Sequence, residues 1–446
     1  MNDTPLNNPS FRRLFAAQIC SLLGVGLLTV ALSLAAFRIG GAAAGGQILG
    51  LLLALKMVAY VIFAPFAETI LSGHPRKRVM VSLDLGRMVL LLPMAFATET
   101  WQIGVLAFAF FVLASGFTPL FQSVVPDVLS NEEVYTKALA WSRIAYTLEA
   151  VFSPVIAAAL LSIASAKVLF YIAALAFSGS VFALLITHFP PQVKSIVSGS
   201  ILKRAGGGLW IYRQTPRLQG LFLLNFALSL AMAWVLVNSV VYAGDRLGDA
   251  ERYYPKLMAF YGLGALIGAL IIPALLRAMS ERRVMLVGTF GFAATSAVFA
   301  LLQSPPMVLL AVIWMGFGVA SSLVMTPGAL VITRSVGRRA RASVFAAQFS
   351  LSHAGWLVAY PLAGWLASRV SLEQALLLLA ALCTMVACIA TRVWPADDPL
   401  ERQHSHPDLP DDHPHLQQVP ADGKRHRHVH AFRIDELHPT WSQSSI

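Results

Sequence analysis

Long apolar runs separated by short polar segments dominate this chain. A helix that spans a membrane needs about 20 mostly apolar residues, and twelve stretches of the sequence meet that requirement. In the first half these predicted spans are Arg12–Phe37, Gly46–Leu71, Val79–Ala97, Ile103–Val124, Ala138–Ser165 and Val168–Thr187. In the second half they are Leu218–Tyr242, Pro255–Leu276, Val284–Leu302, Pro306–Ile332, Ser343–Ala367 and Leu372–Arg392. The pattern therefore predicts an all-α membrane protein with twelve transmembrane helices.

The two halves repeat each other across one long polar interruption, Pro190–Pro216. Pro65 is matched by Pro273, and Thr118-Pro119 by Thr326-Pro327, both 208 residues later (273 − 65 and 326 − 118). Ordered matches at one offset indicate a duplication, and internal repeats are typical of secondary transporters. We therefore expect two pseudo-symmetric six-helix bundles. The predicted parts are a first bundle at 1–187, a basic cytoplasmic linker at 188–217, a second bundle at 218–392 and a tail at 393–446.

Composition and charge agree with a membrane protein. Hydrophobic residues make up 57% of the chain and charged residues only 12%, whereas a soluble domain carries about 25% charged residues. The net charge is +11, and Lys and Arg gather in one of the two sets of loops. By the positive-inside rule these loops, the linker and both termini are cytoplasmic. Because topology accounts for the basic charge, we expect no nucleic-acid partner.

The linker contains a candidate interfacial helix. The segment Ile201–Gln214 mixes apolar and basic residues, a composition typical of helices that lie along the inner leaflet. A partly ordered linker is the alternative interpretation.

Three ionisable residues fall near the middle of predicted spans. Lys56, Glu149 and His353 belong to spans two, five and eleven, and a charge at the centre of a membrane helix costs about 2.5–3.5 kcal/mol on insertion scales. Such residues are candidates for function: Glu149 for proton exchange, His353 for a proton or a metal ion, and Lys56 as a displaceable counter-charge. Asn225 is a candidate neutral ligand in span seven. The alternative for each is a structural ion pair or a satisfied polar group in the core.

The tail is polar and rich in histidine. Hydrophobicity collapses after Arg392, so we expect a disordered cytoplasmic segment. Eight of the eleven histidines lie there, several as His-x-His pairs, and imidazole suits Ni, Co, Cu and Zn. The candidate metal ligands are His404, His406, His413, His415, His426, His428, His430 and His438. The alternative is a solvated tail whose histidines bind nothing.

Twelve spans, a six-plus-six duplication and a basic central loop resemble the major facilitator superfamily. That family carries a motif of a glycine, an aspartate and a basic cluster between spans two and three. Here Glu68 and Ser72 stand at the Gly and Asp positions, while the basic cluster is retained. The resemblance, over residues 10–392, implies a gating loop with a charge pair rebuilt from Glu68, Asp84 and Arg87. The basic cluster of this gating loop is Arg76, Lys77 and Arg78.

A narrower resemblance rests on Pro126-Asp127, Trp210–Arg213 and Val241–Asp245. These stretches are similar to the branch with drug and siderophore exporters. With the histidine tail, the chain resembles the NreB-type nickel-resistance exporters. That resemblance implies a monomeric transporter of the bacterial inner membrane, which exports Ni²⁺, with Co²⁺ as a second candidate ion, against inward proton flow.

Other function classes follow from the same residues. An exporter of drugs or siderophores with an incidental tail is the alternative, since carboxylate and soft ligands are scarce in the spans. A non-transporting metal sensor is a third class. The sequence has no phosphate loop of the ATP-binding type and no hydrolytic motif, so we expect neither an enzyme nor a resident cofactor.

Overall fold

The computed structural model describes residues 4–71, 74–129, 132–189, 201–302, 304–337, 340–398, 401–405, 427–431, 433–434 and 438. Some side chains inside the helices and strands lie outside this description. The described helices of the first half are η1 (Pro5–Asn7), α1 (Pro9–Leu71), α2 (Arg76–Met94), α3 (Thr100–Val128), α4 (Glu132–Leu161) and α5 (Lys167–Leu185). Those that follow are α6 (Ile201–Gln214), α7 (Pro216–Asp245), α8 (Ala250–Ala278), α9 (Glu281–Leu301), α10 (Met307–Met325), α11 (Gly328–Ser335), α12 (Arg341–Arg369) and α13 (Leu372–Val393).

The first two predicted spans form one bent helix. Helix α1 runs for 63 residues and bends at Gly41, where φ is 57°. This left-handed conformation favours glycine, which has no Cβ to clash with the backbone. The polar interruption between the two spans is therefore a bend within α1.

The tenth predicted span is divided in two. Helix α10 ends at Met325, and α11 begins at Gly328 with Pro327 as its N-cap. A proline inside a helix removes a hydrogen bond and clashes with the preceding turn, so the expected single span breaks here. With α1 counted as two spans and α10–α11 as one, the helices supply the twelve predicted spans, and the predicted fold class is confirmed.

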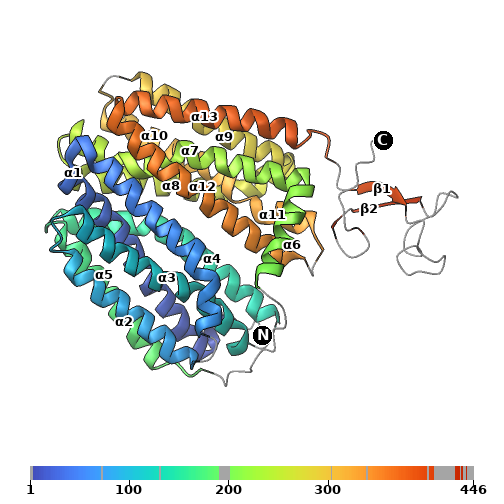
Figure 1. Cartoon of the computed structure of the whole chain (residues 1–446), viewed down its shortest axis with the longest axis horizontal. Coiled ribbons are helices and arrows are strands. Elements are labelled where there is room, and N and C mark those ends of the chain that lie inside the picture. Colours follow the sequence, from blue (N-terminus) through green and yellow to red (C-terminus); the bar gives the residue numbers. More distant parts are fainter. Residues whose placement is uncertain are drawn as a thin grey trace.

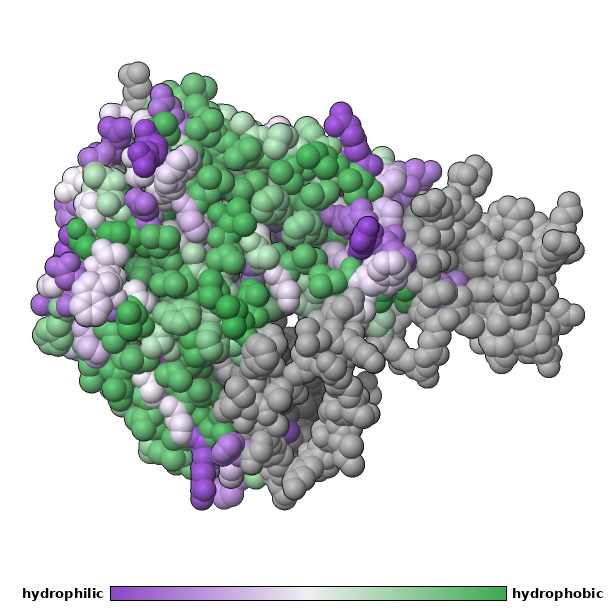
Figure 2. All heavy atoms as spheres, viewed as in Figure 1, coloured by the Kyte–Doolittle hydropathy of each residue, from purple (hydrophilic) through white to green (hydrophobic). Residues whose placement is uncertain are grey.

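The outer surface is apolar, as a lipid-facing surface must be. Figure 2 shows hydrophobic residues over most of the visible face, with hydrophilic residues gathered towards its ends. Large apolar side chains are among the most exposed in the chain, including Leu270 at 71% and Val308 at 77%. Eight helical stretches of the described residues are long and apolar enough to cross a membrane. Such a surface is favourable in lipid and unfavourable in water.

The two bundles contact each other through a few of their helices. In Figure 1 α2, α3 and α5 of the first bundle (blue to cyan) lie on one side of the molecule and α9, α10 and α13 of the second (yellow to orange) on the other. Helices α1 and α4 contact α7, α8 and α12 of the other bundle. At this contact the Tyr254 hydroxyl donates a hydrogen bond of 2.9 Å to Ser33 Oγ. The backbones of α1 and α12 also approach closely, at Gly46 and Gly50 of α1 and at Tyr360 and Gly364 of α12.

The linker forms the expected helix, α6, and α6 packs on the second bundle. Gly208 lies against the Ser343 carbonyl of α12. The Tyr212 hydroxyl donates a hydrogen bond to Gln348 of the same helix, and burial raises the pKa of Tyr212. Leu209 and Trp210 are exposed, which leaves an apolar patch available to the leaflet.

The described part of the tail contains two short strands. Strand β1 (Glu401–Ser405) pairs antiparallel with β2 (Arg427–Ala431). Ile434, only 3% exposed, then bridges to Val336, between α11 and α12. Its backbone N–H donates to Ser335 O, and its carbonyl accepts from Gly337 N. Backbone pairing and one buried apolar side chain order these residues without a core of their own.

Candidate functional site

Lys56 lies on α1 in a partly aromatic setting. Its Nζ is 5.9 Å from the centroid of the Tyr60 ring and 5.7 Å from that of Phe111 on α3. An ammonium group at this distance is attracted by the negative face of an aromatic ring. Because Tyr60 follows Lys56 by four residues, the two share one face of the helix.

His353 approaches the same tyrosine from the other bundle. Its ring centroid lies 5.7 Å from that of Tyr60 and 3.9 Å from that of Phe349 on its own helix, α12. His353 Nδ1 is 2.7 Å from the Phe349 carbonyl. A carbonyl only accepts, so Nδ1 carries the hydrogen, and Nε2 is left as an acceptor in the neutral ring. Tyr60 thus connects a cation of the first bundle to an imidazole of the second.

Glu149 lies on α4 against the backbone of α1. A Cβ placed on Gly26 would overlap Glu149 Oε1 and Ser153 Oγ, so the glycine allows the carboxylate this close approach. The charges of Glu149 and Lys56 attract each other, and the positive charge of Lys56 also reaches the His353 ring. No direct ion pair joins Lys56 and Glu149, both of which the structure describes in full. Their separation leaves Lys56 and Glu149 each able to change partners.

Lys56 and His353 lie at a similar depth. Lys56 follows Gly50 by six residues, and His353 precedes Tyr360 by seven. At 1.5 Å per residue, both side chains are about 10 Å along their helices from the contact between α1 and α12. The structure therefore brings Lys56 and His353 together across the two bundles through Tyr60, and Glu149 lies within charge range of Lys56.

The residues expected in a gating loop separate into different places. Asp84 and Arg87 are 0% and 2% exposed and form an ion pair with each other inside α2. Ser180 donates to Asp84 at 2.5 Å, and Arg87 donates to Ser21 at 3.2 Å. Their i,i+3 spacing on one helix turns both side chains into the bundle core, and the role in gating that the resemblance implies for them stays a prediction. The Glu68 side chain lies outside the description.

The basic cluster of that loop is partly structural. Lys77 Nζ donates to the carbonyls of Leu185 and Thr187, at 2.5 Å and 3.1 Å, and so binds the end of α5, where unpaired carbonyls favour a cation. Arg78 is exposed, and Arg76 has a partner in the structure.

Asn225 lies apart from the three ionisable residues. Its Nδ2 donates to Leu221 O within α7 at 2.8 Å. It lines a cavity of about 30 Å³ together with Ser352 and Trp356 of α12. That volume suits one water molecule.

The tail histidines are only partly within the description. Strand register places His404 opposite His428 and Arg402 opposite His430, while the side chains of these residues are not described. His438 is 5% exposed and already has a partner. His406, His413, His415 and His426 lie outside the described residues. Where the structure is described, no group of three His, Cys, Asp or Glu residues could hold a metal ion.

Sequence reasoning missed Tyr60 and Gly26, which place the ionisable groups. A signal for Tyr60 was present, since an aromatic residue four positions from an intramembrane lysine shares its helix face. Gly26 gave no such signal, because its role depends on α4, more than a hundred residues away in the chain.

Similar proteins of known sequence include two efflux proteins. Macrolide efflux protein A of Streptococcus pyogenes is 22% identical over 273 residues, which are 59% of this chain and 65% of that protein. Macrolide efflux protein A of Enterococcus faecalis is 23% identical over 229 residues, 49% of this chain and 69% of that protein. The chain thus spans about two thirds of the length of these relatives.

Solved structures show the same fold at low identity. A variant of the nucleoside transporter NupG has a TM-score of 0.73 and 15% identity, and the match covers 86% of this chain and all of that one. A bacterial homolog of the human lysosomal transporter Spinster, inward-facing and unoccupied, has a TM-score of 0.69 and 15% identity, over 86% and 98% of the two chains. The sequence profile of the Major Facilitator Superfamily matches residues 14–249 and 221–420. Because this profile matches more than half of the chain, the chain belongs to the Major Facilitator Superfamily.

Proposed function

We propose that the chain is a proton-coupled exporter of a hydrophobic organic compound. The observation that carries the proposal is the group formed by Glu149, Lys56 and His353, which reaches across both bundles through Tyr60. When the bundles rock, groups on opposite sides of such an interface change their neighbours. The carboxylate of Glu149, in an apolar setting, then binds and releases a proton as its surroundings change between the two states.

Three features support an organic substrate. The relatives named above are macrolide efflux proteins. The rings of Tyr60, Phe111 and Phe349 surround the ionisable groups, and aromatic walls with a few polar groups suit such compounds. No metal-binding group occurs among the described side chains.

Efflux of Ni²⁺, with Co²⁺ as a second ion, remains the second candidate. It is favoured by the tail, where β-strand register sets His404 opposite His428. Opposite residues of an antiparallel pair have Cβ atoms about 4.5–5.5 Å apart. In this hypothesis the tail captures metal beside the transporter rather than within the translocation path.

The proposed setting is the bacterial inner membrane, with both termini in the cytoplasm. Fusion of a periplasmic reporter enzyme after residue 446 tests this orientation. An active reporter would contradict the proposed orientation.

Transport into inverted membrane vesicles under an imposed pH gradient separates the candidates. We expect uptake of a radiolabelled macrolide that stops when the gradient is collapsed and is lost in Glu149→Gln. Glu373→Gln, a charge-matched change in the first turn of α13, serves as the control and should transport normally. Uptake of radioactive nickel alone would replace the first candidate with the second. Gradient-independent uptake, or none of either compound, would refute proton-coupled export.

A further inference from the structure

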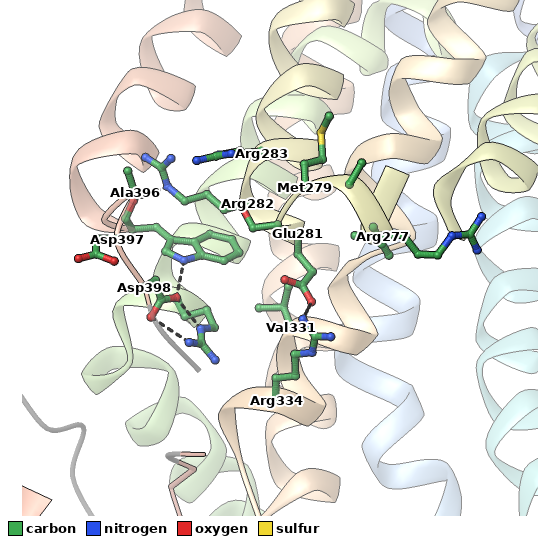
Figure 3. A pocket seen from close by; sticks show the side chains of 15 residues that line it. Arg277, Met279, Glu281, Arg282, Arg283, Val331, Arg334, Ala396, Asp397 and Asp398 are labelled. Atoms are coloured by element: carbon green, nitrogen blue, oxygen red, sulfur yellow. Dashed lines mark hydrogen bonds and ion pairs between the residues drawn. The ribbon is translucent and has the colours of Figure 1, made fainter. Parts of the chain in front are cut away.

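A cavity of about 470 Å³ opens at the end of the second bundle that carries the α8–α9 loop. Figure 3 shows it between the start of α9, the end of α11 and the chain that follows α13. It lies far along the helices from Lys56 and His353, and nothing above assigns it a role. Its charged lining residues are Arg217, Arg277, Arg282, Arg283, Arg334, Glu281, Asp397 and Asp398.

Two of the arginines are neutralised by ion pairs. Arg217 binds both carboxylate oxygens of Asp398, at 2.6 Å and 2.8 Å, and the Trp394 indole donates to the same carboxylate at 2.8 Å. Arg334 pairs with Glu281. These contacts are drawn as dashed lines in Figure 3 and shape the walls of the cavity.

The remaining lining charge is positive. Five arginines against three acids leave an excess of two positive charges (5 − 3). Arg282 donates only to backbone carbonyls, those of Trp394 at 2.6 Å and Thr391 at 3.1 Å, so its charge stays available. Arg283 is exposed and lies close enough to Arg282 for their charges to repel each other. Two adjacent guanidinium groups without a full counter-charge favour an anion with several oxygen acceptors, such as a phosphate group.

The start of α9 adds to the positive electrostatic potential of the cavity. Ser280 is the N-cap and lines the cavity, yet its side chain makes no capping hydrogen bond. The first N–H groups of the 21-residue helix α9 therefore lack that partner, and a helix N-terminus attracts anions. The apolar residues Leu276, Met279 and Val331 line the cavity beside the charges.

We propose that this cavity binds the phosphate headgroup of an anionic phospholipid. One guanidinium group can bind two phosphate oxygens at once through two parallel hydrogen bonds. Basic pockets between membrane helices are known sites for such headgroups. The apolar part of the lining and the exposed apolar surface of α8, including Leu270, favour a lipid over a soluble phosphate. The site is independent of the transported substrate.

Native mass spectrometry of the purified full-length protein tests the proposal. With equal amounts of phosphatidylglycerol and phosphatidylcholine, we expect one phosphatidylglycerol molecule to be retained preferentially. Arg283→Gln should weaken its binding about tenfold, as expected for one lost charge-assisted contact, and Arg283→Lys should restore part of it. Arg392→Gln is the matched control, since Arg392 is an exposed arginine in the last turn of α13 and does not line the cavity.

The outcomes that overturn the proposal are distinct. Equal retention of both lipids by the unaltered protein would remove the anionic site. If Arg283→Gln and Arg392→Gln lost phosphatidylglycerol equally, general surface charge rather than this cavity would bind the lipid. If glycerol phosphate or inorganic phosphate displaced the lipid at equal concentration, the ligand would be a soluble phosphate and the lipid assignment would be wrong. These measurements of lipid binding do not depend on transport, so their results stand even if the protein transports neither macrolide nor nickel.

Discussion

At the scale of single residues, the candidate site depends on an uncharged side chain. The Lys56 ammonium lies over the face of the Tyr60 ring. The ring of His353 is tilted by 58° against that of Tyr60, with 5.7 Å between the centroids. A cation beside an aromatic ring gains about 0.5–2 kcal/mol, more where water is excluded. The ring therefore links the two bundles at the depth of the ionisable groups.

This link predicts different effects for two changes at Tyr60. Tyr60→Phe keeps the ring and should transport at near the normal rate. Tyr60→Ala removes the contact with both Lys56 and His353 and should slow transport severalfold, with a loss of about 1 kcal/mol from the lost cation–ring attraction. Initial transport rates in proteoliposomes measure this. Equal rates for Tyr60→Phe and Tyr60→Ala would show that the ring has no such role.

The buried pair of Asp84 and Arg87 predicts a stability effect instead. Asp84→Asn leaves Arg87 as a buried charge without its counter-charge and should cost about 3–5 kcal/mol. The double variant Asp84→Asn/Arg87→Gln should cost less, because neither charge remains. Thermal unfolding in detergent checks both. A double variant less stable than Asp84→Asn would mean that Arg87 is stabilised mainly by Phe117 and Phe177, whose ring centroids lie 4.5 Å and 4.7 Å from its guanidinium carbon.

At the scale of helices, glycine determines how closely the bundles approach. A Cβ on Gly50 would lie 2.5 Å from the Tyr360 carbonyl oxygen, which as backbone cannot easily move. Gly46 and Gly364 meet in the same way across α1 and α12. Small residues at such positions allow membrane helices to pack backbone to backbone.

Gly50→Ala should therefore weaken closure at this end of the molecule. The expected readout is faster labelling of Ser33→Cys by a membrane-impermeant maleimide, in a background with Cys20, Cys383 and Cys388 replaced by serine. Gly104→Ala is the matched control, because a Cβ there would meet nothing within 4 Å. Identical labelling in both backgrounds would show that α1 and α12 tolerate the added methyl group by a small shift.

The sequence predicted the helices well because each span carries its own apolar signal. Lys56, Glu149 and His353 could be singled out because a charge in an apolar run is costly wherever the helices pack. Their contacts could not be predicted, since Tyr60 and Gly26 act through residues distant in the chain. The same limit applies to Asp84 and Arg87, whose hydrogen bonds with Ser180 and Ser21 join helices distant in the chain.

At the scale of the whole molecule, the tail is attached to the second bundle at two places. Trp394 packs on Gly220 of α7, and Asp398 neutralises Arg217, which is only 5% exposed. Ile434 then joins the backbone between α11 and α12. The first attachment stabilises the second bundle. The second attachment joins the histidine-bearing strands to that bundle.

Two truncations distinguish these attachments. Ending the chain after Trp394 removes the Asp398 carboxylate, which binds Arg217 through both oxygens, and should therefore lower the Tm. Ending it after Asp398 keeps that ion pair and removes residues 399–446, with the strands and Ile434, so the Tm should change much less. With the second truncation, nickel tolerance of expressing cells tests the tail alone: a partial loss fits metal capture by the histidines, while unchanged tolerance contradicts it. If both truncations lowered the Tm equally, the docking of Ile434 rather than the Arg217–Asp398 pair would hold the second bundle together.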